Sequence, residues 1–271
     1  MPALDLPESL FTLNDSTSLS FLDYGFGQTT LLVHGSLCDY RYWRWQMAAL
    51  GEYGKILAPS LRGYWPNAQL TPAPDKRFSV GQHAADLIEL IQATHPDQRV
   101  NVIGHSRGAH VALEVALQAP DTVRSLVLAD PGMNLAGVGH NREFLLRAAE
   151  AISLGNDEDG LATFIDAVSG ADTWRRMTGW FKSMVRDNAR TLLSQAHEAD
   201  ADHDPQPFSA IKCPVLLLGG QQSPPRYSQI MDMLEKHIGQ ARRDTIAMAS
   251  HGMNLANPKS FNRKVLEFLN N

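Results

Sequence analysis

The segment that most constrains this chain is Val100–Ala119, where a β-branched run, a glycine-flanked serine and a helical pattern follow one another. The run Val100–Ile103 is typical of a short buried strand. The alanine- and leucine-rich stretch that ends near Pro120 predicts a helix. Between them lies the G-x-S-x-G turn Gly104–Gly108. A strand, this turn and a helix in that order predict a serine held at a sharp junction with its hydroxyl group exposed.

The geometry of such a junction explains its glycines. Side chains two residues either side of Ser106 would collide in so sharp a turn, so Gly104 and Gly108 leave the necessary space. The helix begins directly after the serine, so its free N–H groups and positive dipole end face any oxyanion formed there. The alternative is a chance glycine-rich turn that contains a serine, and the rest of the chain decides between the two.

Composition places the chain among ordinary globular proteins. Its 271 residues are 44% hydrophobic and 20% charged, which suits one large α/β domain or one domain with an insertion. The net charge of −5 and the lack of a long basic run argue against a nucleic-acid partner. The acidic, proline-broken start does not resemble a signal peptide, and no apolar run reaches the ~20 residues that span a membrane. We therefore expect a soluble, cytoplasmic protein without a membrane partner.

The two cysteines, Cys38 and Cys213, are far apart and lack metal-ligand spacing. This pattern predicts reduced thiols instead of a disulfide or a zinc site. Cys38 lies near the loop that follows an early strand, where it could affect access to a pocket.

Strand and helix patterns alternate along most of the chain. An expected hairpin of two strands comes first, and buried strands follow it: 11–13, 19–24, 30–33, 56–58, 100–103, 123–129, 215–218 and 243–247. Helical patterns separate them: 40–50, 79–94, 109–118, 226–237 and 258–269. This alternation predicts an α/β fold with a mainly parallel sheet and helices on both faces.

Residues 133–208 interrupt the alternation. The strand signal disappears, and four amphipathic helical stretches precede a polar linker: 142–152, 159–168, 172–185 and 188–199. We therefore predict a core domain formed by 1–132 and 209–271, with 133–208 inserted as a helical cap.

Three chemically suited residues fall in loops at the same edge of the predicted sheet. Ligands bind at the carboxyl ends of the strands in such sheets, and Ser106, Asp130 and His251 all lie in loops at those ends. A serine hydroxyl needs a base within hydrogen-bond reach, and the base needs a third group that fixes its tautomer. His251 follows the last strand, and the chain order serine–acid–histidine favours it as the base over a structural loop histidine.

Asp130 is the predicted acid. The usual position is the loop after strand 215–218, but residues 219–225 contain no carboxylate, and Asp232 lies well inside a helix. Asp130 begins the loop after strand 123–129; an Asp-Pro pair can also simply start a turn, but no rival carboxylate is available. The backbone amides of Ser36 and Arg107 are the predicted oxyanion hole.

The other histidines receive structural roles. His105 is expected to pack within the Gly104–Gly108 turn and to point away from Ser106. His34 is expected to hold the loop that carries Ser36 through hydrogen bonds. The Arg107 side chain is expected to be solvated or paired. The remaining histidines are expected at the surface or in caps: His83, His95, His110, His140, His197, His203 and His237. No metal constellation and no phosphate-binding loop occurs, so neither a metal nor a cofactor is expected.

The chain resembles the α/β-hydrolase superfamily over nearly its whole length. The features that carry the resemblance are the His34-Gly35 loop, the turn at Ser106, Asp130, the helical insertion and His251. The resemblance implies that fold, a helical cap and a serine nucleophile. Dehalogenases and epoxide hydrolases of the superfamily use an aspartate nucleophile, which Ser106 argues against. Two features depart from the pattern of the superfamily. The loop that often reads Asp-x-Arg-Gly-x-Gly is Ser60–Trp65 here, and the acid that usually follows the strand at 215–218 is missing.

The predicted reaction is hydrolysis of a carboxylic ester, lactone or thioester of a small apolar or aromatic substrate, through an acyl-enzyme on Ser106. Three alternatives stay open. The same residues could hydrolyse a carbon–carbon bond. Cofactor-free dioxygenases that cleave hydroxyquinolone rings are similar, but carry a tryptophan where Ser36 stands. A ligand receptor without catalysis is the third.

The predicted pocket walls are large apolar side chains, any of which could instead pack the cap on the core: Leu37, Tyr64, Trp65, Met133, Trp174, Met177, Trp180, Phe181, Met184 and Met253. The oligomeric state stays open, a homodimer included.

Overall fold

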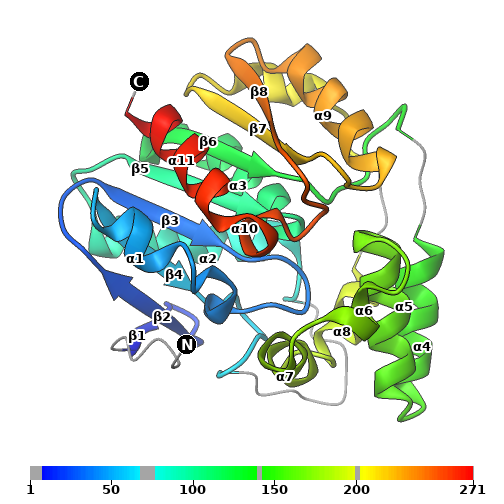
Figure 1. Ribbon diagram of the computed structural model, residues 1–271. Coiled ribbons are helices and arrows are strands. Elements are labelled where there is room, and N and C mark those ends of the chain that lie inside the picture. The colour runs from blue at the N-terminus through cyan, green and yellow to red at the C-terminus, as the bar shows by residue number, and fades with distance from the viewer. Residues whose placement is uncertain (1–7, 68–76, 139–141, 199–201, 271) are drawn as a thin grey trace.

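The computed structural model describes residues 8–67, 77–138, 142–198 and 202–270, which contain one eight-stranded sheet (Figure 1). The strand order is β1-β2-β4-β3-β5-β6-β7-β8. The strands are β1 (Glu8–Thr12), β2 (Ser18–Tyr24), β3 (Thr29–Val33), β4 (Lys55–Pro59), β5 (Val100–His105), β6 (Val123–Ala129), β7 (Val215–Gly220) and β8 (Ala241–Ile246). β1 and β2 form the expected antiparallel hairpin, β2 pairs antiparallel with β4, and all other pairs are parallel. The predicted α/β fold with a mainly parallel sheet is confirmed.

Helices cover both faces of the sheet. One face packs against α2 (Val80–Thr94), α3 (Arg107–Gln118) and α9 (Pro225–His237). The other face packs against α1 (Met47–Gly51), α10 (Met253–Ala256) and α11 (Pro258–Leu269), which lie in front of the strands in Figure 1. Successive strand residues alternate between the two cores: Leu31 and Val33 enter one and Leu32 the other. This alternation is the period of a strand buried on both faces.

The register of the central strands places distant loops side by side. β5 lies between β3 and β6, with Val33 opposite Gly104 and His105 opposite Ala129. Ala129 in turn lies opposite Leu218 of β7. The loops that follow β3, β5, β6 and β7 therefore leave the sheet next to one another at its carboxyl edge.

The chain between β6 and β7 forms helices, which lie together to one side of the sheet in Figure 1. They are α4 (Glu143–Ser153), α5 (Asp157–Ser169), α6 (Thr173–Arg176), α7 (Gly179–Asp187) and α8 (Thr191–His197), called the inserted helices below. The single helix expected over 172–185 is wrong, because Met177 and Thr178 adopt extended backbone with ψ of 147° and 153° between α6 and α7. Phe181 and Met184 share a buried cluster with Tyr42 of the core, so the inserted helices pack on the sheet domain.

Two histidines expected at the surface are buried, which corrects that prediction. His83 and His110 lie on α2 and α3, which pack against each other as well as against the sheet. The Nε2 atom of His83 donates a hydrogen bond of 3.1 Å to the carbonyl oxygen of Arg62. His140 lies outside the described residues. None of the helices that the structure describes is both long and apolar enough to cross a membrane.

Candidate active site

Ser106 lies in a strained turn between β5 and α3. Its φ and ψ are 55° and −123°, a conformation that non-glycine residues rarely adopt. A Cβ atom on Gly104 would lie 2.2 Å from the carbonyl oxygen of Gly108, and one on Gly108 would lie 2.2 Å from that of Val33. Only glycine therefore fits on either side of the serine.

His251 and Asp130 meet at the carboxyl edge although 121 residues separate them. The Nδ1 atom of His251 lies 3.2 Å from Oδ2 of Asp130, whose side chain is fully buried. Ser106 and His251 line the same cavity, without a direct hydrogen bond between them in the described part of the chain. Hydrogen bonds of this kind are often long before a substrate binds.

The loop after β7, which contains no carboxylate, supplies donors to Asp130 instead. The Ser223 hydroxyl donates to Oδ2 of Asp130, and the Gly220 amide lies 3.3 Å from Oδ1. With the His251 ring, these groups satisfy a carboxylate that is removed from water. Sequence reasoning missed Ser223, although its place in the loop where the acid usually lies was a usable signal.

Two aromatic rings contact the His251 ring. The Tyr227 ring stacks on it at 4.2 Å between centroids with 16° between planes, and the Tyr227 hydroxyl lies 3.3 Å from Nε2. Because the two rings are nearly parallel, this hydroxyl approaches Nε2 from above the ring. The in-plane lone pair of Nε2 therefore stays available for a serine hydroxyl. The second ring is that of His105, on β5, whose centroid lies 4.5 Å from the centroid of the His251 ring.

His105 has a larger role than elbow packing. Its Nε2 donates a 2.7 Å hydrogen bond to the backbone carbonyl oxygen of His251. Burial holds the pKa of His105 well below its usual range, so the ring is neutral and carries its proton on Nε2. This bond fixes the backbone of the loop that carries His251.

Two backbone segments approach Ser106 closely. A Cβ atom on Gly35 would lie 3.0 Å from the Ser106 Cβ, and one on Gly132 would lie 3.1 Å from both the Ser106 Oγ and the Arg107 amide nitrogen. The Arg107 amide is one of the first of α3, so it has no acceptor within the helix. Ser36 lines the same two cavities as Ser106. That its amide and the Arg107 amide form an oxyanion hole stays a prediction.

His34 holds the loop that carries Ser36. Its Nδ1 donates a 2.9 Å hydrogen bond to the carbonyl oxygen of Gly35, and its Nε2 accepts a 3.0 Å bond from the Leu61 amide. Burial lowers the pKa of His34 to about 4, so the ring stays neutral and serves as one donor and one acceptor.

The Arg107 side chain is paired, one of the two expected outcomes, and it is also buried. Its Nη1 lies 2.6 Å from Oε2 of Glu198, and the two side chains are 7% and 17% exposed. Oε1 of Glu198 accepts a 2.6 Å bond from the Val80 amide. Glu198 follows α8, so this ion pair ties the end of the inserted helices to α2 and α3.

Two cavities meet at Ser106 and Ser36. One, of about 670 Å³, is mainly apolar and reaches His251 and Cys38; its aromatic and methionine walls include Tyr42, Trp45, Met177, Trp180, Phe181 and Met248. The other, of about 660 Å³ and called the polar cavity below, also has a mainly apolar wall, but that wall contains charged and imidazole side chains: Arg107, His110, Glu114, Arg142, Glu198 and Arg226. Burial raises the pKa of the Cys38 thiol well above its usual range.

The structure brings only part of the predicted pocket wall to these cavities. Met177, Trp180 and Phe181 line the apolar cavity, and Met133 lines the polar one. Six residues line neither cavity: Leu37, Tyr64, Trp65, Trp174, Met184 and Met253. All but Trp65 are buried in the hydrophobic cores, so their apolar surface is already used for packing. The Trp65 ring lies 3.7 Å below the Arg41 guanidinium.

Comparison with known proteins supports the fold. A solved esterase from Exiguobacterium antarcticum has a TM-score of 0.85 at 19% identity, over 98% of this chain and 100% of its own. The enol-lactonase from Burkholderia xenovorans LB400 has a TM-score of 0.80 at 21% identity, over 97% and 100%. The RutD protein of Caulobacter sp. (strain K31), provisionally named a carbamate hydrolase, is 25% identical over 89% of this chain and 90% of its own.

A family model described as "Alpha/beta hydrolase family" matches residues 30–264, which include the strained serine turn, Asp130 and His251. The match covers most of the chain, and the solved structures share its fold from end to end. The chain therefore belongs to the alpha/beta hydrolase family.

Proposed function

We propose that this protein is a serine hydrolase that cleaves a carboxylic ester or lactone through an acyl-enzyme on Ser106. The observation that carries the proposal is the 3.2 Å contact of Asp130 with Nδ1 of His251, at a cavity that both His251 and Ser106 line. This contact fixes the tautomer in which Nε2 of His251 has a free lone pair and can accept a proton.

The proposed reaction proceeds in two halves. In the first, Ser106 Oγ attacks the carbonyl carbon while Nε2 of His251 takes the hydroxyl proton, and the buried Asp130 carboxylate stabilises the imidazolium. The Ser36 and Arg107 amides donate to the oxyanion. His251 then returns the proton to the leaving alkoxide. In the second half, water attacks the acyl-serine with His251 as the base, which releases the acid and Ser106.

The two cavities support a binding mode in which two parts of the substrate lie in different cavities. An apolar or aromatic group fits beside Trp180 and Phe181, which line the apolar cavity. The more polar part of the substrate fits the cavity beside Arg107. Phe164 and Val168 of α5 line both cavities, which supports the inserted helices as a cap that shapes both sides of the site.

The test is hydrolysis of p-nitrophenyl esters by the wild type, Ser106→Ala and Asp130→Asn. Ser106→Ala should lose about six orders of magnitude in kcat and Asp130→Asn about four, while both stay folded. The matched control is Asp232→Asn, which removes the first carboxylate after β7; Asp232 pairs with Arg243 at the surface, so this variant should keep wild-type turnover. Ester turnover that survives Ser106→Ala, or a folded wild type that hydrolyses no ester, contradicts the proposal.

A further inference from the structure

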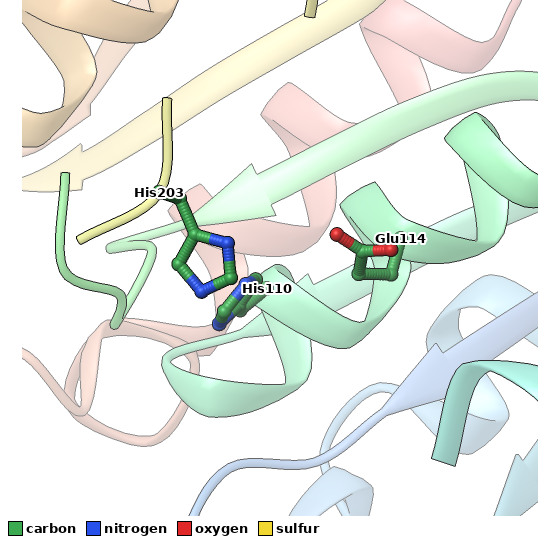
Figure 2. Close-up of side chains that lie close together, drawn as sticks. All are labelled: His110, Glu114 and His203. Carbon is green, nitrogen blue, oxygen red and sulfur yellow. The ribbon is translucent and has the colours of Figure 1, made fainter. Parts of the chain in front are cut away.

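Three side chains of metal-ligand type gather in the polar cavity (Figure 2). His110 and Glu114 lie one turn apart on α3, and His203 comes from the segment that returns from the inserted helices to β7. The candidate ligand atoms all lie within 4.8 Å of one another. The rings of His110 and His203 meet edge to face, with 4.5 Å between centroids. The sequence separates these residues too widely for spacing alone to reveal the group.

One atom of this group has no partner. His110 is 6% exposed, and its Nε2 is buried without a hydrogen-bond partner among the described residues. An isolated buried polar atom costs stability, so such an atom calls for a ligand.

Charged side chains of both signs line the cavity around the group: Glu114 and Glu198 are negative, and Arg107, Arg142 and Arg226 are positive. Glu114 contributes a negative charge, and its Oε2 accepts a 3.1 Å bond from Gln118 that helps to orient the carboxylate. The nearby Arg107 guanidinium is compensated by Glu198 at 2.6 Å. The backbone of His203 is held by a 3.0 Å bond from its amide to the carbonyl oxygen of Asn134. The ligands therefore come from backbone that is already in place.

We propose that His110, Glu114 and His203 bind a zinc ion. Two imidazole nitrogens and one carboxylate oxygen form a set that zinc prefers, with bonds of about 2.0–2.2 Å and a fourth position left for water. The side chains need to close by on the order of 1 Å to reach that geometry. Zinc bound here would tie the segment that contains His203 to α3, the helix that begins directly after Ser106.

The experiment is a titration of the full chain, freed of metal by a chelator, with zinc chloride in a calorimeter. The wild type should bind one zinc ion, with a rise in Tm. Cobalt(II) in place of zinc should give the intense visible absorption bands of a four-coordinate ion. In His203→Gln and Glu114→Gln, affinity should fall by at least about 100-fold, because each variant removes a direct ligand.

His197→Gln is the matched control. His197 lines the same cavity, but its Nδ1 bonds to the carbonyl oxygen of Leu193 at 2.7 Å and it lies outside the cluster. This variant should bind zinc like the wild type. His203 is only half-buried, so His203→Gln should keep the Tm of the metal-free wild type and thereby exclude misfolding as the cause of lost binding. A wild type that binds no zinc, or equal affinity in the wild type and His203→Gln, overturns the proposal.

Discussion

The Nε2 atom of His105 donates a 2.7 Å hydrogen bond to the backbone carbonyl oxygen of His251, 146 residues further along the chain. The residue next to Ser106 thus fixes the loop that carries the candidate base. His105→Phe keeps a ring but leaves this buried carbonyl without its donor. We expect a loss of about 1–3 kcal/mol in the free energy of unfolding.

The same variant should lower kcat on the order of 10-fold with little change in KM, because the loop positions His251 rather than binding substrate. Urea unfolding and ester kinetics measure the two effects. Tyr42→Phe is the control for the unfolding measurement, since it removes only the hydroxyl 3.3 Å from His105 Nε2 and keeps the bond to His251. Wild-type kcat in a folded His105→Phe protein would show that this bond does not position the base.

Gly132 borders the space beside the candidate nucleophile. A methyl group there would lie 3.1 Å from both the Ser106 Oγ and the Arg107 amide nitrogen. Gly132→Ala should therefore lower kcat for esters on the order of 10- to 100-fold, because the methyl crowds the predicted oxyanion site. Gly179→Ala serves as the control: a Cβ there meets nothing within 4 Å, so activity should not change. Equal kinetics for the two variants would place the oxyanion elsewhere.

The Arg107–Glu198 ion pair should matter strongly for stability. Glu198→Gln leaves a buried guanidinium without its counter-charge, and we expect a loss of about 3 kcal/mol or more in urea unfolding. Replacing the arginine as well, in the Arg107→Met/Glu198→Gln double variant, should recover most of this loss, because no uncompensated charge then remains. If the double variant is less stable than Glu198→Gln alone, the pair contributes more than mutual compensation of charge.

The sequence was sufficient to predict the sheet and the serine turn. Gly104 and Gly108 identify the turn because no other residue fits there, and Ser79 predicts the start of α2, where its side chain accepts from the Gln82 amide. These signals are local, so they do not depend on how distant segments pack. Assigning the acid to Asp130 relied on the lack of carboxylates at 219–225, and the same loop turns out to donate to that residue.

The side chains that surround the site could not be predicted. Tyr227, Glu198 and His203 reach the cavities because of how α9, the inserted helices and α3 pack, and no local pattern encodes that packing. Leu37 and Tyr64 were predicted to line the pocket, but they are buried in the hydrophobic cores. An apolar residue next to a catalytic loop serves the core equally well, and position in sequence does not distinguish the two uses.

Stability should depend on pH through His34. Its pKa is about 4 in the folded chain and about 6.5 when unfolded, so between these values the unfolded state binds more protons. The free energy of unfolding should therefore fall as pH decreases from about 6.5 to about 4, by up to about 3 kcal/mol from this residue. The buried His83, His105 and His110, whose pKa values are also lowered, should act in the same direction.

His34→Gln tests this contribution. Glutamine does not titrate, so the variant should be less stable at neutral pH but should lose less stability than the wild type on acidification. Urea unfolding at several pH values between about 4 and about 7 measures both slopes. A variant with the same pH dependence as the wild type would show that His34 does not stay neutral in the folded chain.

Trp180 should limit the size of the acyl group that the apolar cavity accepts. Its ring lines that cavity beside Phe181, and Trp180→Ala would enlarge the space available to a substrate. Within a series of p-nitrophenyl esters, the maximum of kcat/KM should move to longer acyl chains, with a gain on the order of 10-fold for the longest ester accepted.

Trp65→Ala is the matched control. It also removes an indole ring, but Trp65 lies against Arg41 and lines neither cavity, so the acyl-chain profile of this variant should stay that of the wild type. If both variants shift the profile equally, the effect comes from loosened packing. If neither does, the acyl group does not bind beside Trp180, which contradicts the prediction.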